Sequence, residues 1–433
     1  MRDYQEAVSY LEELATFGWK PGLERIRRLL ALLGNPEREL PCIHVGGTNG
    51  KGSVTVTLAT LLARQGYQVG QSISPEIYDV RERISINGQW IPEEDLTALL
   101  DPVRQAEQQM LAEGGEGPTN FEVWTALAFL WFRKMKVDLA VIEVGLGGEI
   151  DSTNVIIPLV SVITNVSIDH KDYLGETEEE IAAVKSGIIK KNRPVVTGTL
   201  HAGALRVLEK RARKEDAPIY RFGIEFQGLE KGFSESRSAF FFQNPDMEEE
   251  VSYSLVGHHQ VINGSMALQT LWLLSRMGYA LDMLQAIRDM ESVFWAGRLE
   301  LIEKGDRRIL LDAAHNLEGA RNLALALRDI YSYRHLILLV GILADKERGK
   351  MIDYLGPFGD KVIITRPNNP RAGDFRGVAQ YFQPYKGEVI LEEDPERALA
   401  LGLSLAGAED LLCITGSIYM LKEIRRLLKE DHK

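Results

Sequence analysis

The stretch His44–Val56 reads HVGGTNGKGSVTV, a glycine-rich run that joins an apolar segment to a helix-forming one. The common phosphate-binding loop has the pattern G-x-x-x-x-G-K-[ST], in which the hydroxyl residue directly follows the lysine. Here Gly46 lies one position too close to Gly50, the glycine that precedes Lys51. A further glycine, Gly52, separates Lys51 from the hydroxyl residue Ser53. The stretch is therefore a damaged motif, a chance glycine run, or a phosphate loop of another type.

The flanking residues favour a phosphate loop. PCIHV before the glycines predicts a strand, and SVTVTLATLLARQGY after them predicts a helix that begins at Ser53. In that arrangement backbone N–H groups and the helix dipole face bound phosphates, the lysine contacts the β and γ phosphates, and the hydroxyl binds Mg²⁺. The alternative is a glycine-rich turn with a surface lysine. The glycines that would free the backbone are Gly46, Gly47, Gly50 and Gly52.

The composition is that of a globular protein of two or three domains, because the chain has 433 residues, 45% hydrophobic and 26% charged. A net charge of −12 argues against a nucleic-acid backbone or an anionic membrane as the main partner. The cysteines, Cys42 and Cys413, lie in apolar strand-like runs, so we expect buried thiols and a reducing cytoplasm. We expect neither a signal peptide nor a membrane-spanning segment.

Apolar runs alternate with helical patterns along the chain, which predicts an α/β fold with a mostly parallel sheet covered on both faces. The first helix is expected at about Tyr4 to Thr16, and a second, apolar nearly all round, over residues 120–135. Further helices are predicted at 178–191 and 260–279. The predicted strands of this part are residues 41–45, 137–145, 159–166 and 193–200.

A change of pattern and a second α/β series indicate the domain organisation. Residues 222–256 predict antiparallel strands at a sheet edge. A new series begins near Arg298, with a helix expected after each strand, and its strands are residues 307–314, 335–343, 361–367 and 411–417. We therefore predict an N-terminal mononucleotide-binding domain over residues 1–296 and a smaller, Rossmann-like C-terminal domain over residues 297–433.

Three ionisable residues follow the strands that come after the loop. Glu143 ends a buried strand, and ligands of parallel sheets bind at the carboxyl ends of strands, so this carboxylate is a candidate Mg²⁺ ligand. Its alternative is a solvated strand end. His170 follows the next strand, although a lone histidine is more often a structural hydrogen-bonding group. Lys185 lies on a predicted helix, where a solvated charge is the ordinary interpretation.

The segment GTNGKGS resembles the ATP loop of folylpolyglutamate synthases and of the related bifunctional dihydrofolate synthases, which are grouped with the Mur ligases as ATP-dependent amide-bond-forming enzymes. DHKDYLG and KSGIIK are similar to further motifs of that family. The resemblance implies that Lys185 is carbamylated by CO₂ and that Ser74, in SISPEI, binds Mg²⁺. It also implies two Mg²⁺ sites, with Ser53, Ser74, Glu143, His170 and Lys185 as ligands. The expected ATP-loop residues are Gly47, Thr48, Asn49, Gly50, Lys51, Gly52 and Ser53.

The C-terminal half matches the same family in order. The matching segments are GHHQVINGSMAL, WAGRLELI, LLDAAHNLEGA, GILADKE and ITGSIYM. The resemblance implies that Asn263, Arg298 and Asp312 contact ATP. It places His315, Ser417 and Asp151 at the substrate, with Lys51, His170, Lys185, Arg298 and His315 as catalytic residues. The matches also include Asn316, Asp345 and Lys346.

Each of these residues has a plainer interpretation when it is taken singly. Asp312 or Asn316 would cap the following helix, with Asn316 the better spaced, and Arg298 would pair with a surface acid. Three residues depart from the family pattern. Glu76 follows SP where the family often has His or Phe, which puts the acceptor preference in doubt; the others are Glu149 and Ala296, which replace the common Arg and Pro.

The expected function is an ATP-dependent ligase that adds L-glutamate to a folate through an acyl phosphate, with dihydropteroate left open as a second acceptor. The expected partners are small molecules, and a cytoplasmic monomer is expected. The resemblance also implies a site between the domains that closes about residues 295–298. The alternatives are a Mur-type ligase acting on another carboxylate, a regulatory P-loop NTPase, and an inactive relative.

Overall fold

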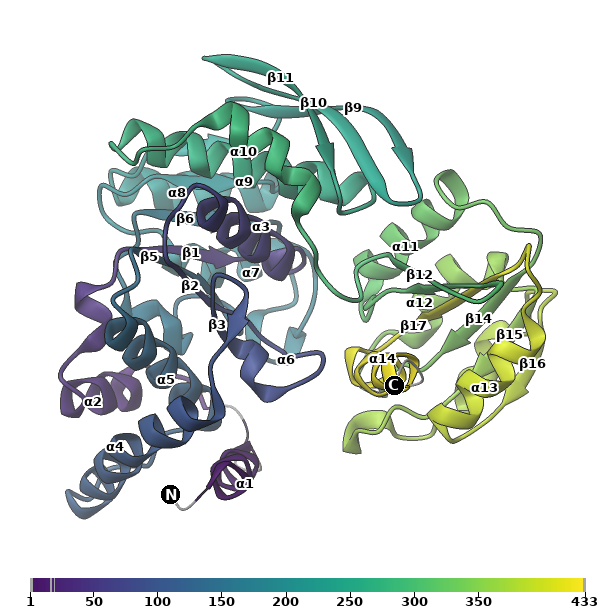
Figure 1. Cartoon of the computed structure of the whole chain (residues 1–433), viewed down its shortest axis with the longest axis horizontal. Helices are drawn as coiled ribbons and strands as arrows, with labels where there is room; N and C mark the ends of the chain where they lie inside the picture. The colour runs from purple at the N-terminus through teal and green to yellow at the C-terminus, as the bar shows by residue number, and fades with distance from the viewer. Residues whose placement is uncertain (1–2, 16–17, 19, 431–433) are drawn as a thin grey trace. The chain divides into compact units, whose positions relative to one another are not determined.

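The structure is a computed structural model that describes residues 3–15, 18 and 20–430 (Figure 1). Its contacts divide the chain into two compact units. Unit 1 comprises residues 1–229, 241–251 and 262–293, and unit 2 comprises residues 230–240, 252–261 and 294–433. The predicted boundary near residues 295–298 stays a prediction. Among the described residues, no helix combines the length and apolar character needed to cross a membrane.

Unit 1 is built on an eight-stranded sheet of order β4-β3-β2-β5-β1-β6-β7-β8. The strands from β2 to β8 pair in parallel, while β3 and β4 are antiparallel additions at one edge. The mostly parallel α/β sheet is therefore confirmed. The bounds are β1 Cys42–Gly46, β2 Val69–Ser72, β3 Ile84–Ile86, β4 Gln89–Trp90, β5 Leu139–Glu143, β6 Val160–Ile163, β7 Val195–Thr197 and β8 Ile219–Arg221.

Helices pack around this sheet because its central strands are buried on both faces. One core joins the helices α1 (Tyr4–Ala15), α2 (Glu24–Leu32), α4 (Glu93–Ala112) and α5 (Asn120–Met135) to the sheet. A second core joins α7 (Glu178–Lys185) and α8 (Ala202–Lys214) to β6 and β7. The remaining helices of this part are α3 (Lys51–Arg64), α6 (Lys171–Leu174), α9 (His258–Arg276) and α10 (Met283–Asp289).

Helix α5 has the predicted bounds and is buried along most of its length. A capping box between Thr119 and Glu122 starts it, and Lys136 ends it in the left-handed conformation. The first predicted helix is also present, although Thr16 lies outside the described residues.

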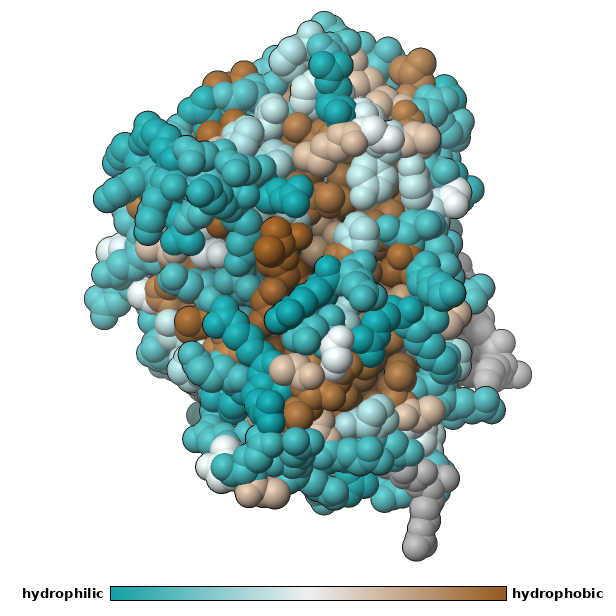
Figure 2. All heavy atoms as spheres, turned by 90° about the vertical axis from the view of Figure 1, so that its left-hand side faces the viewer, coloured by the Kyte–Doolittle hydropathy of each residue, from teal (hydrophilic) through white to brown (hydrophobic). Residues whose placement is uncertain are grey.

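Figure 2 views the left-hand side of Figure 1 and shows that hydrophilic side chains cover most of that face, with apolar residues between them.

The antiparallel strands predicted within residues 222–256 exist, but they do not lie at the edge of the large sheet. They form a separate three-stranded sheet of order β11-β10-β9, with bounds β9 Gln227–Ser234, β10 Arg237–Asn244 and β11 Met247–Tyr253. Two-residue connections join these strands, and such short connections permit only antiparallel pairing. Ser238, Phe240 and Phe242 alternate as buried residues along β10, so one face of this sheet packs as a layer of its own.

Unit 2 contains a six-stranded sheet of order β12-β13-β17-β14-β15-β16. All its pairs are parallel except β12 with β13. The strands are β12 Glu300–Lys304, β13 Arg307–Leu311, β14 Leu336–Val340, β15 Lys361–Ile364, β16 Glu388–Leu391 and β17 Leu411–Thr415. The helices are α11 (Leu317–Asp329), α12 (Arg348–Leu355), α13 (Pro395–Leu405) and α14 (Ile418–Glu430).

Two features of unit 2 correct the sequence prediction. The edge strands β12 and β16 were not predicted, because both are partly exposed and lack a continuous apolar run. A helix was expected after every strand, but β15 leads instead into the 3₁₀ turns Pro370–Ala372 and Arg376–Phe382. The prolines and glycine of RPNNPRAG account for this, since proline removes a helix donor and restricts the residue before it.

Candidate functional site

The site in unit 1 lies where four neighbouring parallel strands end. In the sheet β2, β5, β1 and β6 are consecutive, and Val45 pairs with both Glu143 on β5 and Val162 on β6. The segments that follow these strands carry Ser74, the phosphate loop and the residues around Asp169. Because these strands are parallel, their C-terminal ends lie on the same side of the sheet. Ligands of parallel sheets bind on that side, so the topology brings the predicted ligand-binding segments together there.

At two positions the glycine-rich loop has a backbone conformation that residues with a side chain rarely adopt. Gly47 has φ 140° and Gly50 has φ 81°. A Cβ atom at Gly47 would lie 1.8 Å from the hydroxyl oxygen of Thr164. Helix α3 begins at Lys51 rather than at the predicted Ser53, because Gly50 takes the left-handed N-cap position and the next residue can already be helical.

Asn263 lies beside this loop, on α9. A Cβ atom at Gly50 would lie 2.6 Å from the side-chain oxygen of Asn263. The glycine therefore allows the asparagine to approach the loop closely. The structure thus brings Asn263, predicted from resemblance alone, next to the loop where the phosphates would bind.

The segment after β6 holds the loop in shape, and sequence analysis did not single out its residues. The Thr48 N–H donates to the Asn165 carbonyl at 3.0 Å, and the Asn49 N–H donates to the Asn165 side chain at 2.8 Å. The Thr164 hydroxyl donates to the Asn49 carbonyl at 2.6 Å. The Thr48 hydroxyl donates to the Ser167 carbonyl at 3.0 Å. The run of polar residues directly after a buried strand was the available signal.

Two lysines converge on the Gly47 carbonyl. Lys51 Nζ donates to it at 3.3 Å and to the Thr48 carbonyl at 3.1 Å, and Lys185 Nζ donates to it at 2.8 Å. Lys185 is only 3% exposed, so its interpretation as a solvated surface charge is wrong. Burial and, to a smaller extent, the charge of Lys51 lower the pKa of Lys185 to about 7, against the opposing effect of Asp169 and Asp151.

Asp151 is buried at the end of a chain of hydrogen bonds. Its carboxylate accepts hydrogen bonds from the N–H groups of Leu146 at 2.8 Å and Thr153 at 2.9 Å, and from the Thr153 hydroxyl. Since that hydroxyl gives its hydrogen to Asp151, its oxygen accepts from Nε2–H of His44 at 2.8 Å. Burial raises the pKa of Asp151 and lowers that of His44 to about 3, so His44 is neutral.

The candidate ligands of the first metal include a pair that the structure brings together. Glu143 is buried at the end of β5, and its carboxylate accepts the Ser74 N–H at 3.0 Å. The interpretation of Glu143 as a solvated strand end is therefore wrong. Ser53 is buried in the first turn of α3. A carboxylate and hydroxyl oxygens beside a phosphate loop suit Mg²⁺.

His170 differs from the other candidates because its side chain is 39% exposed. It has φ 50°, its N–H donates to the Asp169 carboxylate at 2.8 Å, and its Nε2 lies 4.0 Å from the other oxygen of that carboxylate. The neighbouring Asp169, which was not among the predicted site residues, acts electrostatically on Lys185.

The loop after Ser74 places the unusual Glu76 in an ion pair. Its carboxylate lies 2.7 Å from Nε of Arg83, whose guanidinium lies 5.3 Å from the ring centroid of Trp124. Within the same loop, the Glu82 carboxylate accepts the N–H of Ile77 at 2.7 Å, and burial raises the pKa of Glu82 to about 7. Glu76 and Glu82 therefore hold the conformation of the loop that we expect beside the acceptor.

In unit 2 the Asp312 carboxylate organises the turn that carries Arg298. One oxygen accepts the Leu299 N–H at 3.0 Å and the other accepts the Ala314 N–H at 2.9 Å. Burial raises the pKa of Asp312 to about 6, although the charge of Arg298 opposes the rise. Asp312 does not cap α11; Asn316 does, by accepting the Gly319 N–H at 2.9 Å, so of the two capping hypotheses only that for Asn316 is confirmed.

The remaining predicted residues of unit 2 lie in the segments that follow β13, β14 and β17 of its sheet. His315 is half-buried and donates from Nδ1 to the Ala313 carbonyl at 2.8 Å. Ser417 is buried after β17, and its hydroxyl accepts the Tyr419 N–H at 3.2 Å, which supports the start of α14. Asp345 is exposed and pairs with Arg371 at 3.1 Å, and Lys346 lies next to it.

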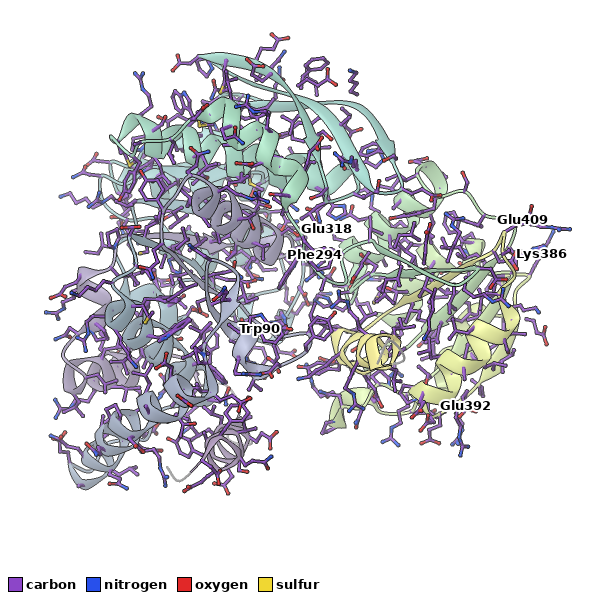
Figure 3. All side chains as sticks on the ribbon, viewed as in Figure 1. Trp90, Phe294, Glu318, Lys386, Glu392 and Glu409 are labelled. Atoms are coloured by element: carbon purple, nitrogen blue, oxygen red, sulfur yellow. The ribbon has the colours of Figure 1, made fainter. Side chains whose placement is uncertain are left out.

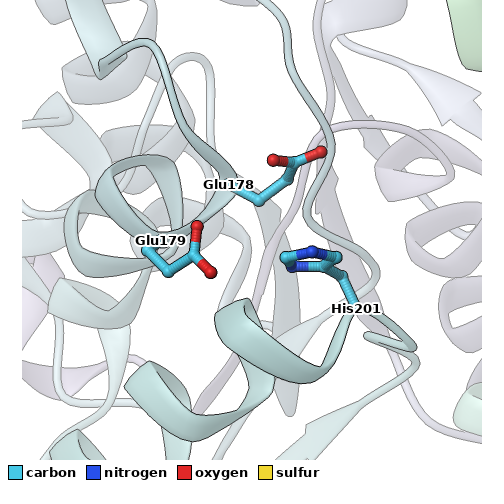
Figure 4. Close-up of side chains that lie close together, drawn as sticks. All are labelled: Glu178, Glu179 and His201. Carbon is cyan, nitrogen blue, oxygen red and sulfur yellow. The ribbon is translucent and has the colours of Figure 1, made fainter.

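Glu178, Glu179 and His201 form a further group of side chains close enough to share a metal ion (Figure 4). However, Nδ1 of His201 accepts the Ala204 N–H at 3.2 Å and so caps α8. A neutral imidazole that accepts at Nδ1 carries its hydrogen on Nε2, which leaves no second lone pair for a metal. Metal binding there would require loss of the helix cap.

Comparisons with known proteins agree with this geometry. Residues 45–271 match the Mur ligase middle domain, and residues 297–418 match the Mur ligase, glutamate ligase domain. The dihydrofolate synthase/folylpolyglutamate synthase of Bacillus subtilis is 35% identical to this chain and aligns over 98% of it and 99% of that protein. The folylpolyglutamate synthase of Lacticaseibacillus casei is 35% identical over the same shares. The structure of Mycobacterium tuberculosis folylpolyglutamate synthase complexed with ADP is 31% identical, with a TM-score of 0.90 over 98% of this chain and 99% of that one.

The phosphate loop, the two α/β sheets and the two domain matches define an ATP-dependent ligase of the Mur type. The near-complete alignments narrow the class further. The chain belongs to the folylpolyglutamate and dihydrofolate synthase family, whose members are ATP-dependent glutamate ligases. The family resemblance seen in the sequence is thereby confirmed.

Proposed function

We propose that this protein joins the α-amino group of L-glutamate to the γ-carboxylate of a reduced folate, with ATP as the source of activation. The proposal rests on the convergence of Lys51 and Lys185 on the Gly47 carbonyl, in the loop that follows β1, and on the pairing of β1 with the strand that ends at Glu143. An anion-binding loop next to a buried carboxylate suits a nucleotide phosphate with its metal. The family relationship supports glutamate as the second substrate.

In the first half of the reaction, an oxygen of the acceptor carboxylate attacks the γ-phosphorus of ATP. The bond between that phosphorus and the β,γ-bridging oxygen breaks, which gives an acyl phosphate and ADP. The loop N–H groups and Lys51 would hold the phosphates, with Asn263 beside the loop. Their contribution is positioning and stabilisation of negative charge.

In the second half, the glutamate amino group attacks the acyl carbon, and the tetrahedral intermediate expels phosphate to leave an amide. We propose that His315 and Ser417 act near the incoming glutamate and that Asp151 acts on the substrate side. Arg298 and Asp312 are proposed ATP contacts. The positive charge of Arg298 would stabilise the negative charge that develops on the transferring phosphoryl group in the transition state.

The donor set in unit 1 fits Mg²⁺. Ser53, Ser74 and Glu143 would hold a first ion, because a buried carboxylate and hydroxyl oxygens are suitable ligands. Glu143, His170 and a carbamate on Lys185 would hold a second. When bound, Mg²⁺ would neutralise charge on the phosphate oxygens and on the acceptor carboxylate.

The environment of Lys185 supports carbamylation. A pKa lowered to about 7 by burial leaves much of the amine neutral near pH 7. The neutral amine would attack the carbon of CO₂ and then release a proton, which leaves an anionic carbamate. This reaction replaces a buried amine, whose protonated form is repelled by Lys51, with an anionic oxygen donor that Lys51 would attract.

The test is release of ADP by the purified protein with Mg²⁺ and ATP, measured with and without glutamate. A reduced monoglutamyl folate and dihydropteroate serve as parallel acceptors. We expect glutamate-dependent release with the folate. Turnover with dihydropteroate as well would establish the second activity, and turnover with the folate alone would make Glu76 the first residue to exchange. Absence of glutamate-dependent release with either acceptor would contradict the proposal and favour another carboxylate or a simple NTPase.

We also propose that the protein acts as a monomer in the cytoplasm. The free, buried thiols of Cys42 and Cys413 fit a reducing compartment. Sedimentation equilibrium measures the oligomeric state, and a mass of twice the chain would contradict the first part of this proposal.

A further inference from the structure

Arg425 and Glu300 form a buried ion pair within unit 2. Arg425 projects from α14 and Glu300 begins β12, and their side chains are 3% and 10% exposed. Arg425 Nε donates to one carboxylate oxygen at 2.8 Å, and Nη2 donates to the other. The guanidinium also lies 5.7 Å from the ring centroid of Phe294, and this ring is 62% exposed. Phe294 is labelled in Figure 3.

Glu300 connects this pair to the turn that carries Arg298. The carboxylate oxygen that accepts from Arg425 Nε also accepts the Gly297 N–H, at 2.8 Å. The two-pronged contact with the guanidinium fixes the plane of the carboxylate. The orientation of the acceptor for Gly297 therefore depends on Arg425, which lies far away in the sequence.

The turn needs such support, because the residues on both sides of Arg298 have left-handed backbones. Gly297 has φ 65°, and Leu299, which is not glycine, has φ 49°. A non-glycine residue in this region costs on the order of 1 kcal/mol or more and persists only where its surroundings hold it. The Leu299 N–H donates to Asp312, and its carbonyl accepts from the Tyr331 hydroxyl at 3.1 Å. The Gly297 carbonyl accepts the Ala313 N–H at 2.9 Å.

The stability of the fold does not by itself explain why a buried ion pair occupies this position. Replacement of a buried ion pair by neutral groups of similar volume is often neutral or stabilising, whereas removal of one partner is costly. The pair instead holds one side of the Arg298 turn, and Asp312 holds the other. We propose that Arg425 is a positioning residue that, through Glu300 and Gly297, aims Arg298 for the phosphoryl-transfer step; this inference rests on the proposed function.

The test compares Arg425→Met with the double variant Arg425→Met/Glu300→Gln. The single variant leaves a buried carboxylate unpaired, so a loss of folding there would not be informative. In the double variant both charges are absent, and the amide introduced on β12 retains an acceptor oxygen whose orientation nothing fixes. We expect its thermal midpoint to stay near that of the wild type while kcat for glutamate-dependent ADP release falls by about ten- to a hundredfold, the cost of a misplaced catalytic group.

Arg425→Lys keeps the charge and loses the two-pronged contact, so its kcat should be intermediate. Arg426→Met is the matched control, because Arg426 is the exposed neighbour on the same helix, and it should match the wild type. The decisive comparison repeats the double variant in an Arg298→Met background. If Arg425 acts through Arg298, the double variant should cause no further loss there.

Three outcomes would overturn the inference. A wild-type kcat in the folded double variant would remove any role for Arg425 while the proposed function stands. Losses that multiply in the Arg298→Met background would mean that Arg425 acts by another route. A fully active Arg298→Met variant would contradict the proposed role of Arg298 itself, and the inference with it.

Discussion

At the scale of single residues, the family resemblance pointed to more candidate site residues than the chemistry of each residue alone could justify. A lysine on a helix is ordinarily a solvated charge, and only the family resemblance pointed to Lys185. In the structure this lysine is buried, donates to the Gly47 carbonyl and feels the charge of Lys51, which supports the proposed role without testing it. Thr164 and Asn165 were missed because their role depends on β6 lying next to β1, which is a fact of topology rather than of local pattern.

Lys185→Ala should abolish glutamate-dependent ADP release while the fold is kept, because the site loses its proposed carbamate. Circular dichroism and the thermal midpoint check the fold. Short carboxylates added to the variant should restore part of the activity, and depletion of CO₂ should slow the wild type. A fully active variant would contradict the role of Lys185 as precursor of a metal ligand.

Gly47→Ala should destabilise the protein and disable the loop, because the new Cβ atom would meet the Thr164 hydroxyl at 1.8 Å. Gly66→Ala is the matched control, since Gly66 also has a positive φ but has nothing within 4 Å of the added atom. The control should lose about 1 kcal/mol of unfolding free energy and keep its activity. Equal losses in the two variants by denaturant titration would show that the crowding at Gly47 is unimportant.

His44 predicts a pH dependence of stability with a defined sign. Burial lowers the pKa of His44 from 6.5 to about 3, so between those values the unfolded chain binds the proton and the folded chain does not. Stability from this group is therefore present above pH 6.5 and is lost as the pH falls toward 3, by at most about 1.4 kcal/mol per pH unit.

His44→Gln keeps an N–H donor for Thr153 but does not titrate. Denaturant titrations at a series of pH values should give a shallower slope between pH 6.5 and 3 for this variant than for the wild type. An unchanged slope would mean that His44 contributes little to the acid sensitivity.

At the scale of elements, predictions succeeded where the pattern was long and apolar. Helix α5 was predicted with its bounds, and the central strands β1, β5 and β6 were found. The strands β12 and β16 were missed, because an edge strand that is partly exposed has no continuous apolar run. Gly50 moved the start of α3, since a cap in the left-handed region leaves no side-chain pattern to detect.

The 3₁₀ turn Ser152–Val155 depends on one hydroxyl that links it to β1. Thr153→Val removes the group that donates to Asp151 and accepts from His44, so it leaves two buried polar groups without that partner. We expect a loss of about 1–3 kcal/mol in unfolding free energy, together with a lower kcat. Thr153→Ser keeps the hydroxyl and should preserve both quantities. A Val variant with the stability and kcat of the wild type would contradict this role.

At the scale of the whole molecule, the ordered series of motifs predicted the family and the two α/β sheets, which is more than any single motif could do. The proposed groups are divided between the units: Lys51, Glu143 and Lys185 belong to unit 1, while Arg298 and His315 belong to unit 2. The closure expected about residues 295–298 stays a prediction. Glu76, which departs from the family pattern and is held by Arg83, is the first residue to exchange in a test of acceptor preference.

The most direct test of the proposed reaction follows an oxygen atom. The acceptor folate is labelled with ¹⁸O in its γ-carboxylate and incubated with Mg²⁺, ATP and glutamate, and the released phosphate is analysed by mass spectrometry. An acyl phosphate requires one carboxylate oxygen to leave with each phosphate, so we predict one ¹⁸O per phosphate, formed only with glutamate present. Unlabelled phosphate, released whether or not glutamate is present, would mean that water attacks ATP, and it would contradict the assignment of this chain as a ligase.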